Sequence, residues 1–215
     1  MKDAREAKAY FDNYFVKDAA RAGVWREIAR FVQRDIADPS SLLELGCGYG
    51  DFIQEISVAR KIAMDLNENS RQGIPQEIRF VQGDCVDLSF LNDGEVANVF
   101  ASNLLEHIER SRLDRVMAEI SRVLKNNGRM IIIQPNYRLC SARYFDDYTH
   151  VTIFSDISMR GFLESNGFRT VRSIPGLLPF SMKSKIPRHP LLVRFYLAAW
   201  IRPFARQMYV VAEKE

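Results

Sequence analysis

Apolar positions along this chain fall into two repeating patterns, short unbroken runs and longer stretches with helical spacing. Residues 130–133 are apolar on both faces, as expected of a buried parallel strand, while residues 111–124 place apolar side chains at every third or fourth position. These two kinds of segment alternate, which predicts an α/β fold, a doubly wound and mostly parallel sheet with helices on both faces. The predicted strands are 41–45, 60–65, 78–82, 96–101, 130–133, 168–174 and 207–212, and the predicted helices are 4–18, 24–36, 51–58, 111–124 and 156–166.

The chain length of 215 residues suits one domain with a full core, and we expect a single domain over 1–215. Residues 1–37 are predicted to form a helical cap. Residues 175–206 are predicted to form a basic, apolar insertion before the last strand, interrupted by five prolines. The three cysteines are scattered and lack the spacing of a disulfide framework or a zinc site, which favours a cytoplasmic location.

The most informative stretch is a glycine-rich turn that follows the first predicted strand. Gly46, Gly48 and Gly50 lack the Cβ atoms that would keep a ligand away from the backbone, and a helix is predicted directly after them. The next strand ends in Asp65, which is placed to bind both hydroxyls of a ribose. Glu44 would repel a pyrophosphate but suits a cationic ligand end. The pattern therefore predicts a pocket for an adenosine-containing cofactor.

The Glu-x-Gly-x-Gly-x-Gly pattern of residues 44–50 resembles the first motif of the class I S-adenosylmethionine-dependent methyltransferases. The resemblance covers residues 40–174 and 207–213. It implies a Rossmann-like seven-stranded sheet whose last strand is antiparallel and lies between strands five and six, and it implies S-adenosyl-L-methionine as the cofactor. The cofactor-binding residues expected from the pattern and the resemblance are Glu44, Gly46, Cys47, Gly48, Asp65, Leu66, Asp84, Cys85, Asn103 and Tyr14. The alternatives are a helix cap at Asp65 and a simple turn at residues 84–85.

Strand four runs into Ser-Asn-Leu-Leu-Glu-His-Ile at 102–108, which is similar to the small-molecule branch of this family and lacks the Asn-Pro-Pro-Tyr pattern of its amino-group methylases. The resemblance implies that His107 packs against the sheet more often than it acts as a base. The loop after strand five lies above the predicted pocket and offers three catalytic candidates, His150, Asp147 and Tyr148. A neutral histidine there can take a proton from the acceptor, or it can brace the loop. The reaction needs no metal, and we expect no metal-ligand cluster.

Positive charge concentrates near the C-terminus, although the net charge is only +3. Residues 165–212 contain no acidic residue and eight basic ones, namely Arg169, Arg172, Lys183, Lys185, Arg188, Arg194, Arg202 and Arg206. Pro190 is predicted to open a helix that runs through Trp200 and is too short to span a bilayer. This region either contacts a membrane surface through 181–206, or it packs on the sheet or on a second copy. No nucleic-acid partner is expected, because the stretch lacks the spaced aromatics of a base-stacking surface.

Together these features predict an S-adenosylmethionine-dependent methyltransferase that acts on oxygen, in preference to nitrogen, of a small-molecule or lipid-linked glycan acceptor. The tail is similar to that of bacterial methyltransferases associated with cell-surface glycan synthesis, which implies peripheral contact with the inner membrane face. The alternative is a non-catalytic S-adenosylmethionine-binding protein recruited to a membrane or protein partner. A nucleotide-dependent oxidoreductase is a third hypothesis. The sequence specifies neither the acceptor nor the oligomeric state.

Overall fold

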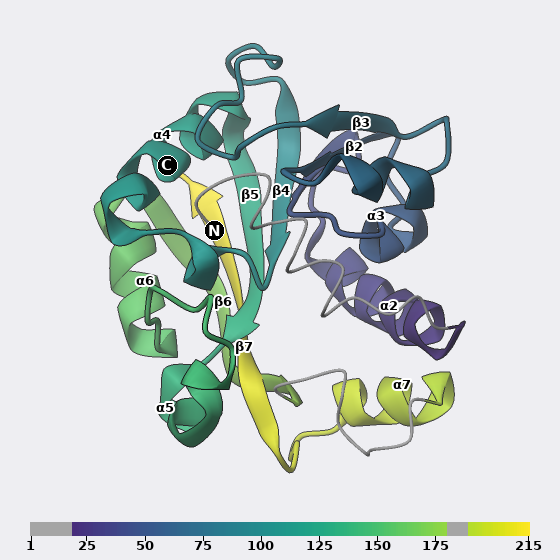
Figure 1. Cartoon of the computed structure of the whole chain (residues 1–215), viewed down its shortest axis with the longest axis vertical. Helices are drawn as coiled ribbons and strands as arrows, with labels where there is room; N and C mark the ends of the chain where they lie inside the picture. The colour runs from purple at the N-terminus through teal and green to yellow at the C-terminus, as the bar shows by residue number, and fades with distance from the viewer. Residues whose placement is uncertain (1–18, 180–188) are drawn as a thin grey trace.

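The computed structural model describes residues 19–179 and 189–215, which form a seven-stranded sheet with helices on both faces (Figure 1). The strand order is β3-β2-β1-β4-β5-β7-β6. Strands β1 to β5 pair in parallel, and β7 is antiparallel to both β5 and β6. The predicted α/β class is confirmed, as is the antiparallel last strand between strands five and six. The single domain over 1–215 stays a prediction.

The strands are β1 Ser41–Leu45, β2 Arg60–Asp65, β3 Arg79–Gln82, β4 Val96–Ser102, β5 Leu124–Pro135, β6 Phe168–Pro179 and β7 Ala205–Lys214. The α-helices are α2 Ala19–Val32, α3 Asp51–Glu55, α4 Arg110–Val123, α5 Tyr137–Cys140, α6 Asp156–Ser165 and α7 Pro190–Ala198. Short 3₁₀ helices lie between them at η1 Gln33–Asp35, η2 Glu68–Gly73, η3 Leu105–His107 and η4 Ser141–Asp146.

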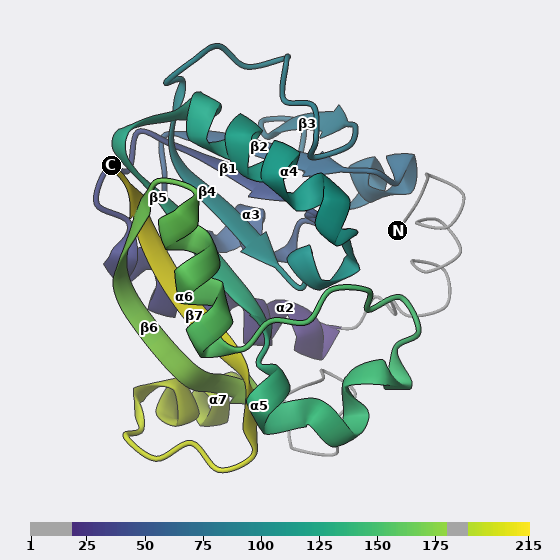
Figure 2. The same ribbon diagram turned by 90° about the vertical axis from the view of Figure 1, so that its left-hand side faces the viewer.

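Each face of the sheet buries its own apolar layer, because successive side chains of a strand point to opposite faces. On β1, Leu43 and Leu45 join α4 and α6 in one layer, whereas Leu42 joins α2 and α3 in the other. Figure 2 shows α4 and α6 in front of the sheet, with α2 behind it. Helix α7 packs in the second layer through Leu197, which is buried.

Several elements begin or end away from their predicted boundaries. Helix α2 begins at Ala19 rather than at residue 24, and α3 ends at Glu55 rather than at residue 58, because Ile56 is already extended. Strand β6 continues to Pro179 rather than ending at residue 174, and its pairing with β7 shifts register on the way. The helix predicted at 4–18 lies outside the described residues.

The Asn-Asn-Gly stretch at 126–128 has the composition of a helix cap, but it does not cap helix α4. Helix α4 ends at Val123, and the turn lies within β5. Positive φ falls on Asn127, at 59°, and not on the glycine. Gly128 serves close packing instead, since a Cβ there would lie 2.8 Å from the carbonyl oxygen of Lys125.

The region between β6 and β7 is shorter than the predicted insertion at 175–206, because both strands extend into it. Helix α7 ends at Ala198, so Trp200 lies beyond the helix. Within 19–179 and 189–215, no helix is both long enough and apolar enough to cross a membrane.

Candidate functional site

The glycine-rich turn connects β1 to α3 at the carboxyl edge of the sheet, where ligands of such folds bind. Gly46, Gly48 and Gly50 have φ angles of 67°, 54° and 72°, in the left-handed region that favours glycine. Gly50 also precedes α3 directly, and a Cβ there would lie 2.7 Å from Cγ1 of Ile74. Both the backbone conformation and the packing therefore require glycine at this point of the turn.

Asp65, at the end of β2, is hydrogen-bonded to the glycine-rich turn. One carboxylate oxygen accepts the N–H of Gly48 at 2.8 Å, and the other accepts the N–H of Asn67 at 2.9 Å. Burial raises the pKa of the Asp65 carboxyl, and these backbone donors oppose that shift. Each oxygen keeps a further lone pair for a ligand hydroxyl. The local cap and the ligand role are therefore compatible at this residue.

Glu44 is buried at the end of β1 and holds the first turn of α3. Its Oε2 accepts the N–H of Ile53 at 3.0 Å. Burial raises the pKa of Glu44 well above the usual value, with a smaller opposing effect of that hydrogen bond. A buried carboxylate with one donor strongly favours a nearby positive charge. Glu44 thus fits the cationic end of a ligand.

Asp84 and Cys85, the next two cofactor-binding candidates, follow β3. Asp84 has an ion-pair partner that the sequence did not reveal. Asp84 forms an ion pair with Arg112 of α4 and accepts the N–H of Val86 at 3.2 Å. Burial raises the pKa of the neighbouring Cys85 thiol to about 12. Leu66 is partly buried after the end of β2. This side of the turn therefore combines an apolar residue with a carboxylate of fixed orientation.

Asn103 joins three strands at the same edge. It has a φ of 49° and donates its N–H to the carbonyl of Ile133 at 2.8 Å. Its Oδ1 accepts from Nε2 of Gln207 in β7 at 2.6 Å. Cys47 is buried in the glycine-rich turn, where its N–H donates to the carbonyl of Met64 at 3.0 Å. The remaining cofactor candidate, Tyr14, lies outside the described residues.

Hydrogen bonds hold the segment between η4 and α6 against η3, although the bonded residues are more than forty positions apart in sequence. The N–H groups of Val151 and Thr152 both donate to the carbonyl of Glu106, at 2.9 and 3.1 Å. The hydroxyl of Thr152 donates to the carbonyl of Ile108 at 2.6 Å. The Tyr144 hydroxyl donates to the carbonyl of Thr152. These bonds place the loop with the catalytic candidates above the end of β4.

His150 and His107 are buried beside each other, with ring centroids 4.9 Å apart. Nδ1 of His150 lies 2.6 Å from the carbonyl oxygen of Tyr144, and Nδ1 of His107 lies 3.2 Å from that of Thr149. A carbonyl oxygen only accepts, so each Nδ1 carries the hydrogen and each Nε2 bears the lone pair. Burial lowers the pKa of both rings, that of His107 to about 4.

The two other catalytic candidates differ in exposure. Asp147 is partly buried and accepts from both the N–H and the hydroxyl of Thr149. Burial works against ionisation, but these bonds hold the pKa of Asp147 below its usual value. Tyr148 is 67% exposed and faces solvent. The structure thus brings Asp147 and His150 together and leaves Tyr148 at the surface.

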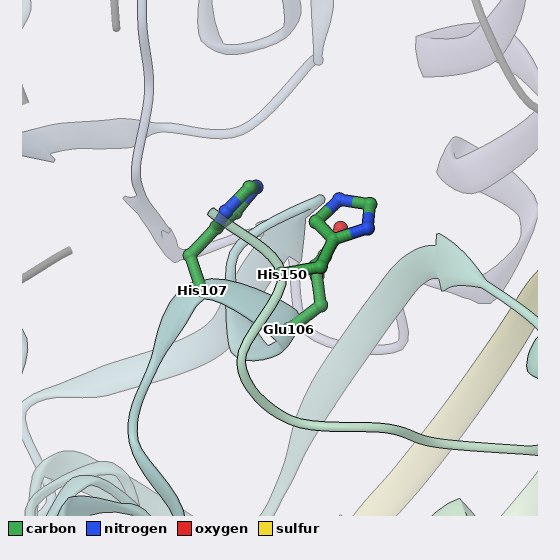
Figure 3. Close-up of side chains that lie close together, drawn as sticks. All are labelled: Glu106, His107 and His150. Atoms are coloured by element: carbon green, nitrogen blue, oxygen red, sulfur yellow. The ribbon is translucent and has the colours of Figure 1, made fainter. Parts of the chain in front are cut away.

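Glu106 was not singled out by the sequence, yet it lies with the two histidines (Figure 3). Its side chain is fully buried, and within the described residues neither carboxylate oxygen has a hydrogen-bond partner. Burial raises the pKa of Glu106 to about 8. One ligand atom from each of Glu106, His107 and His150 lies within 4.8 Å of the other two. The expectation that no metal-ligand cluster would form did not foresee this grouping.

Part of the chain matches a known protein family. Residues 43–132 match the family model described as a methyltransferase domain. A putative methyltransferase of Encephalitozoon cuniculi is 30% identical over 125 residues, which are 57% of this chain and 58% of that protein. The aligned stretch therefore spans little more than half of that relative.

Two solved structures share the fold. One is an S-adenosylmethionine-dependent methyltransferase from Archaeoglobus fulgidus, with a TM-score of 0.64, 20% identity, and coverage of 88% of this chain and 94% of that one. The other is a geranyl diphosphate C-methyltransferase from Streptomyces coelicolor, solved with Mg²⁺, geranyl diphosphate and S-adenosyl-L-homocysteine. It has a TM-score of 0.64 and 16% identity, and the alignment covers 87% of this chain and 77% of that one. The resemblance inferred from residues 44–50 is confirmed in both the matched domain and the fold.

Proposed function

We propose that this chain, which carries the fold and domain of a class I S-adenosylmethionine-dependent methyltransferase, transfers a methyl group to oxygen on a small-molecule or lipid-linked glycan acceptor. The observation that carries the proposal is the glycine-rich turn held by Asp65, inside the stretch that matches a methyltransferase domain. When bound, S-adenosyl-L-methionine supplies an electrophilic methyl group. The protein's main task is then to align the acceptor with it.

The residues present suit this cofactor. Gly46 and Gly48 expose backbone for its methionine part, Glu44 offers negative charge to its cationic end, and Asp65 retains lone pairs for ribose hydroxyls. The adenine would lie against Leu66. The remaining residues that we assign to cofactor binding are Cys47, Asp84, Cys85, Asn103 and Tyr14.

His150 is the group that we assign to proton removal. Its Nδ1–H is held by the carbonyl of Tyr144, so Nε2 has the lone pair that can accept the acceptor's hydroxyl proton. Burial lowers the pKa of His150, which keeps the ring neutral and ready to accept near pH 7. Asp147 acts through Thr149, which bonds to the neighbouring His107. Tyr148, at the surface, would contact the acceptor rather than its reacting atom.

A lipid-linked acceptor finds support in an exposed apolar surface around α7. We call it the α7 patch, and it consists of Leu191, Leu192, Phe195, Trp200, Ile201 and Phe204. Trp200 is 97% exposed, which is unusual for a tryptophan in a folded chain. The opposite side of α7 packs on α2 through Leu197 and a two-bond ion pair between Arg194 and Glu27. Leu191, Leu192 and Phe195 therefore lie on α7 away from the residues that pack on the domain, and Trp200, Ile201 and Phe204 follow the helix.

The positive charge near the C-terminus is compensated by ion pairs to a greater extent than the sequence suggests. Arg169 pairs with Glu213 and Arg172 pairs with Asp35, in addition to the pair made by Arg194. Lys183, Lys185 and Arg188 lie outside the described residues. We therefore propose that the patch enters the interface of the inner membrane face mainly through its apolar side chains, with arginines adding attraction to anionic lipid.

The first test incubates the protein with methyl-labelled S-adenosyl-L-methionine and a fractionated bacterial lysate, beside an Asp65→Ala control. Label in the lipid-extractable fraction supports a lipid-linked acceptor, and label in the soluble fraction supports a small-molecule acceptor. Binding of S-adenosyl-L-homocysteine without any labelled product favours a non-catalytic binding protein. Saturation by NAD(P) instead of S-adenosyl-L-homocysteine would favour an oxidoreductase.

A separate test addresses the membrane. Sedimentation with anionic vesicles is compared for the unchanged protein, for Trp200→Ser with Ile201→Ser, and for Ile157→Ser as a control. Ile157 is exposed to a similar degree to Leu192, but it lies on α6 and outside the patch. We expect the double substitution alone to reduce vesicle binding. Equal binding by all three proteins would refute the role of the patch.

A further inference from the structure

We propose that Glu106, His107 and His150 form a binding site for one divalent transition-metal ion of the Zn²⁺ class. The three side chains come from two segments, η3 and the loop after η4, which the hydrogen bonds to the Glu106 carbonyl hold together. Their ligand atoms lie within 4.8 Å of one another. Figure 3 shows the carboxylate of Glu106 beneath the ring of His150, with His107 beside it.

The state of Glu106 is the second observation that points to a ligand. A carboxyl group taken out of water normally has hydrogen-bond donors or a positive charge as compensation. Glu106 is fully buried, and neither of its oxygens has a hydrogen-bond partner among the described residues. A metal ion in contact with this carboxylate would supply the missing compensation.

Both imidazoles have a backbone carbonyl beside Nδ1, as metal-binding histidines often do. Such a ring donates one N–H to a carbonyl or carboxylate and thereby directs the lone pair of its other nitrogen at the metal. Nδ1 of His150 contacts the carbonyl of Tyr144, and Nδ1 of His107 contacts the carbonyl of Thr149. The hydroxyl of Thr149 lies 2.9 Å from the same His107 nitrogen and donates to Asp147. The carboxylate of Asp147 is thus linked to the His107 ring through the hydroxyl of Thr149.

The donor set determines the kind of metal. Two imidazoles and one carboxylate suit Zn²⁺, Co²⁺, Ni²⁺ or Fe²⁺, whereas Mg²⁺ and Ca²⁺ prefer oxygen ligands only. Ligands at about 2.1 Å from a tetrahedral ion are about 3.4 Å apart, so the side chains must close by roughly an ångström when the ion binds. We assign this closure to changes in the χ angles of Glu106 and of the two rings.

Metal occupancy has a consequence for the chemistry proposed for His150. A nitrogen lone pair that is coordinated to a metal cannot accept a proton at the same time. The ion would therefore inhibit methyl transfer, and this inhibition, unlike the binding itself, rests on the proposed function. The site would thus make the protein sensitive to transition metals.

The test measures binding of Co²⁺ and Zn²⁺ to the full chain, by Co²⁺ absorption and by calorimetry. We expect saturable binding of one ion per chain. Glu106→Gln and His150→Ala should each weaken binding at least tenfold, since both remove a ligand. His189→Ala is the matched control, because His189 is exposed and lies outside the cluster. It should bind as the unchanged protein does.

The same samples are titrated with S-adenosyl-L-homocysteine, so a variant that fails to fold is recognised by its loss of cofactor binding. Absence of saturable metal binding in a protein that binds S-adenosyl-L-homocysteine would overturn the metal site and leave the proposed function intact. Equal binding by Glu106→Gln, His150→Ala and the unchanged protein would also overturn it. Metal binding by a protein that shows no methyl transfer even after a chelator has removed the metal would instead contradict the proposed function alone.

Discussion

Two regions at the carboxyl edge of the sheet hold their buried acidic groups in different ways. On the β1 and β2 side, Glu44 and Asp65 each accept backbone N–H groups from neighbouring turns. On the β4 side, Glu106 has no hydrogen-bond partner within the described residues and lies against two histidines. Backbone N–H groups hold the carboxylates of the first region, whereas the carboxylate of Glu106 has no such donor among the described residues.

The two regions therefore differ in their capacity to change protonation or ligand. Backbone donors stay in place whatever the side chains are, so the cofactor side is suited to one constant ligand. Side chains such as His150 can exchange a proton or coordinate an ion, so the region around Glu106 is suited to a change of protonation or ligand. Substitutions should therefore separate binding from turnover.

The largest effect is expected from His150→Ala on the acceptor side. Removal of the proposed base should lower turnover by about 10²-fold or more and leave the affinity for S-adenosyl-L-homocysteine unchanged. Steady-state kinetics and calorimetry on the same preparation measure the two quantities. A parallel loss of cofactor affinity would show that the two regions are not independent and that the histidine braces the loop.

Gly50→Ala tests the backbone-set region. The left-handed conformation and the approach to Ile74 should together reduce the free energy of unfolding by about 2 kcal/mol. Gly94→Ala isolates the effect of conformation, because Gly94 has a φ of 63° with nothing near its Cβ position. Gly161→Ala, in an open position on α6, should be neutral or stabilising. Denaturant unfolding ranks the three; an unaffected Gly50→Ala would remove the structural argument for this glycine.

Glu44→Gln removes charge from the cofactor side and keeps an oxygen for the N–H of Ile53. We expect about tenfold weaker cofactor binding, or ~1.4 kcal/mol. Because the folded pKa of Glu44 is raised, the carboxyl group destabilises the fold as pH rises above its unfolded value of about 4.3. The variant should therefore gain stability relative to the unchanged protein as the pH rises above this unfolded value, as measured by thermal unfolding. A constant difference over this range would contradict the burial effect.

The smallest effect is expected from Tyr148→Phe. Its side chain is 67% exposed, so loss of the hydroxyl should raise the KM for the acceptor by about threefold at most, with kcat unchanged. Once an acceptor is known, initial-rate kinetics will measure both constants. A large fall in kcat would move this residue from the rim of the site to its reacting centre.

The sequence predicted the neighbourhood of Asp65 better than that of Glu106 for a physical reason. Residues 44–50 and Asp65 lie at strand ends whose positions follow from local apolar patterns, and parallel pairing brings them together. Glu106 has no such local pattern, because its neighbourhood is created by Val151 and Thr152, far along the chain. The grouping of three ligand atoms could not be read from spacing.

The ends of strands and helices were hardest to predict where the backbone departs from the regular repeat of a strand or helix. Strand β6 continues past Pro175 to Pro179, although prolines usually end a strand. Its pairing with β7 shifts register in this stretch, which accommodates a residue without an N–H. The ion pairs of Arg169, Arg172 and Arg194 likewise depend on acidic partners from distant segments, so the basic tail looked more strongly charged in sequence than it is.

The central place of β7 affects how the protein is made. A ribosome synthesises β7 after every other strand of the sheet, yet β7 lies between β5 and β6. Until it emerges, β5 and β6 each present an open edge, and that of β5 includes the apolar stretch 130–133. A nascent chain stalled before residue 205 should therefore be a strong chaperone client, and closure of the sheet should be a late and slow step of folding.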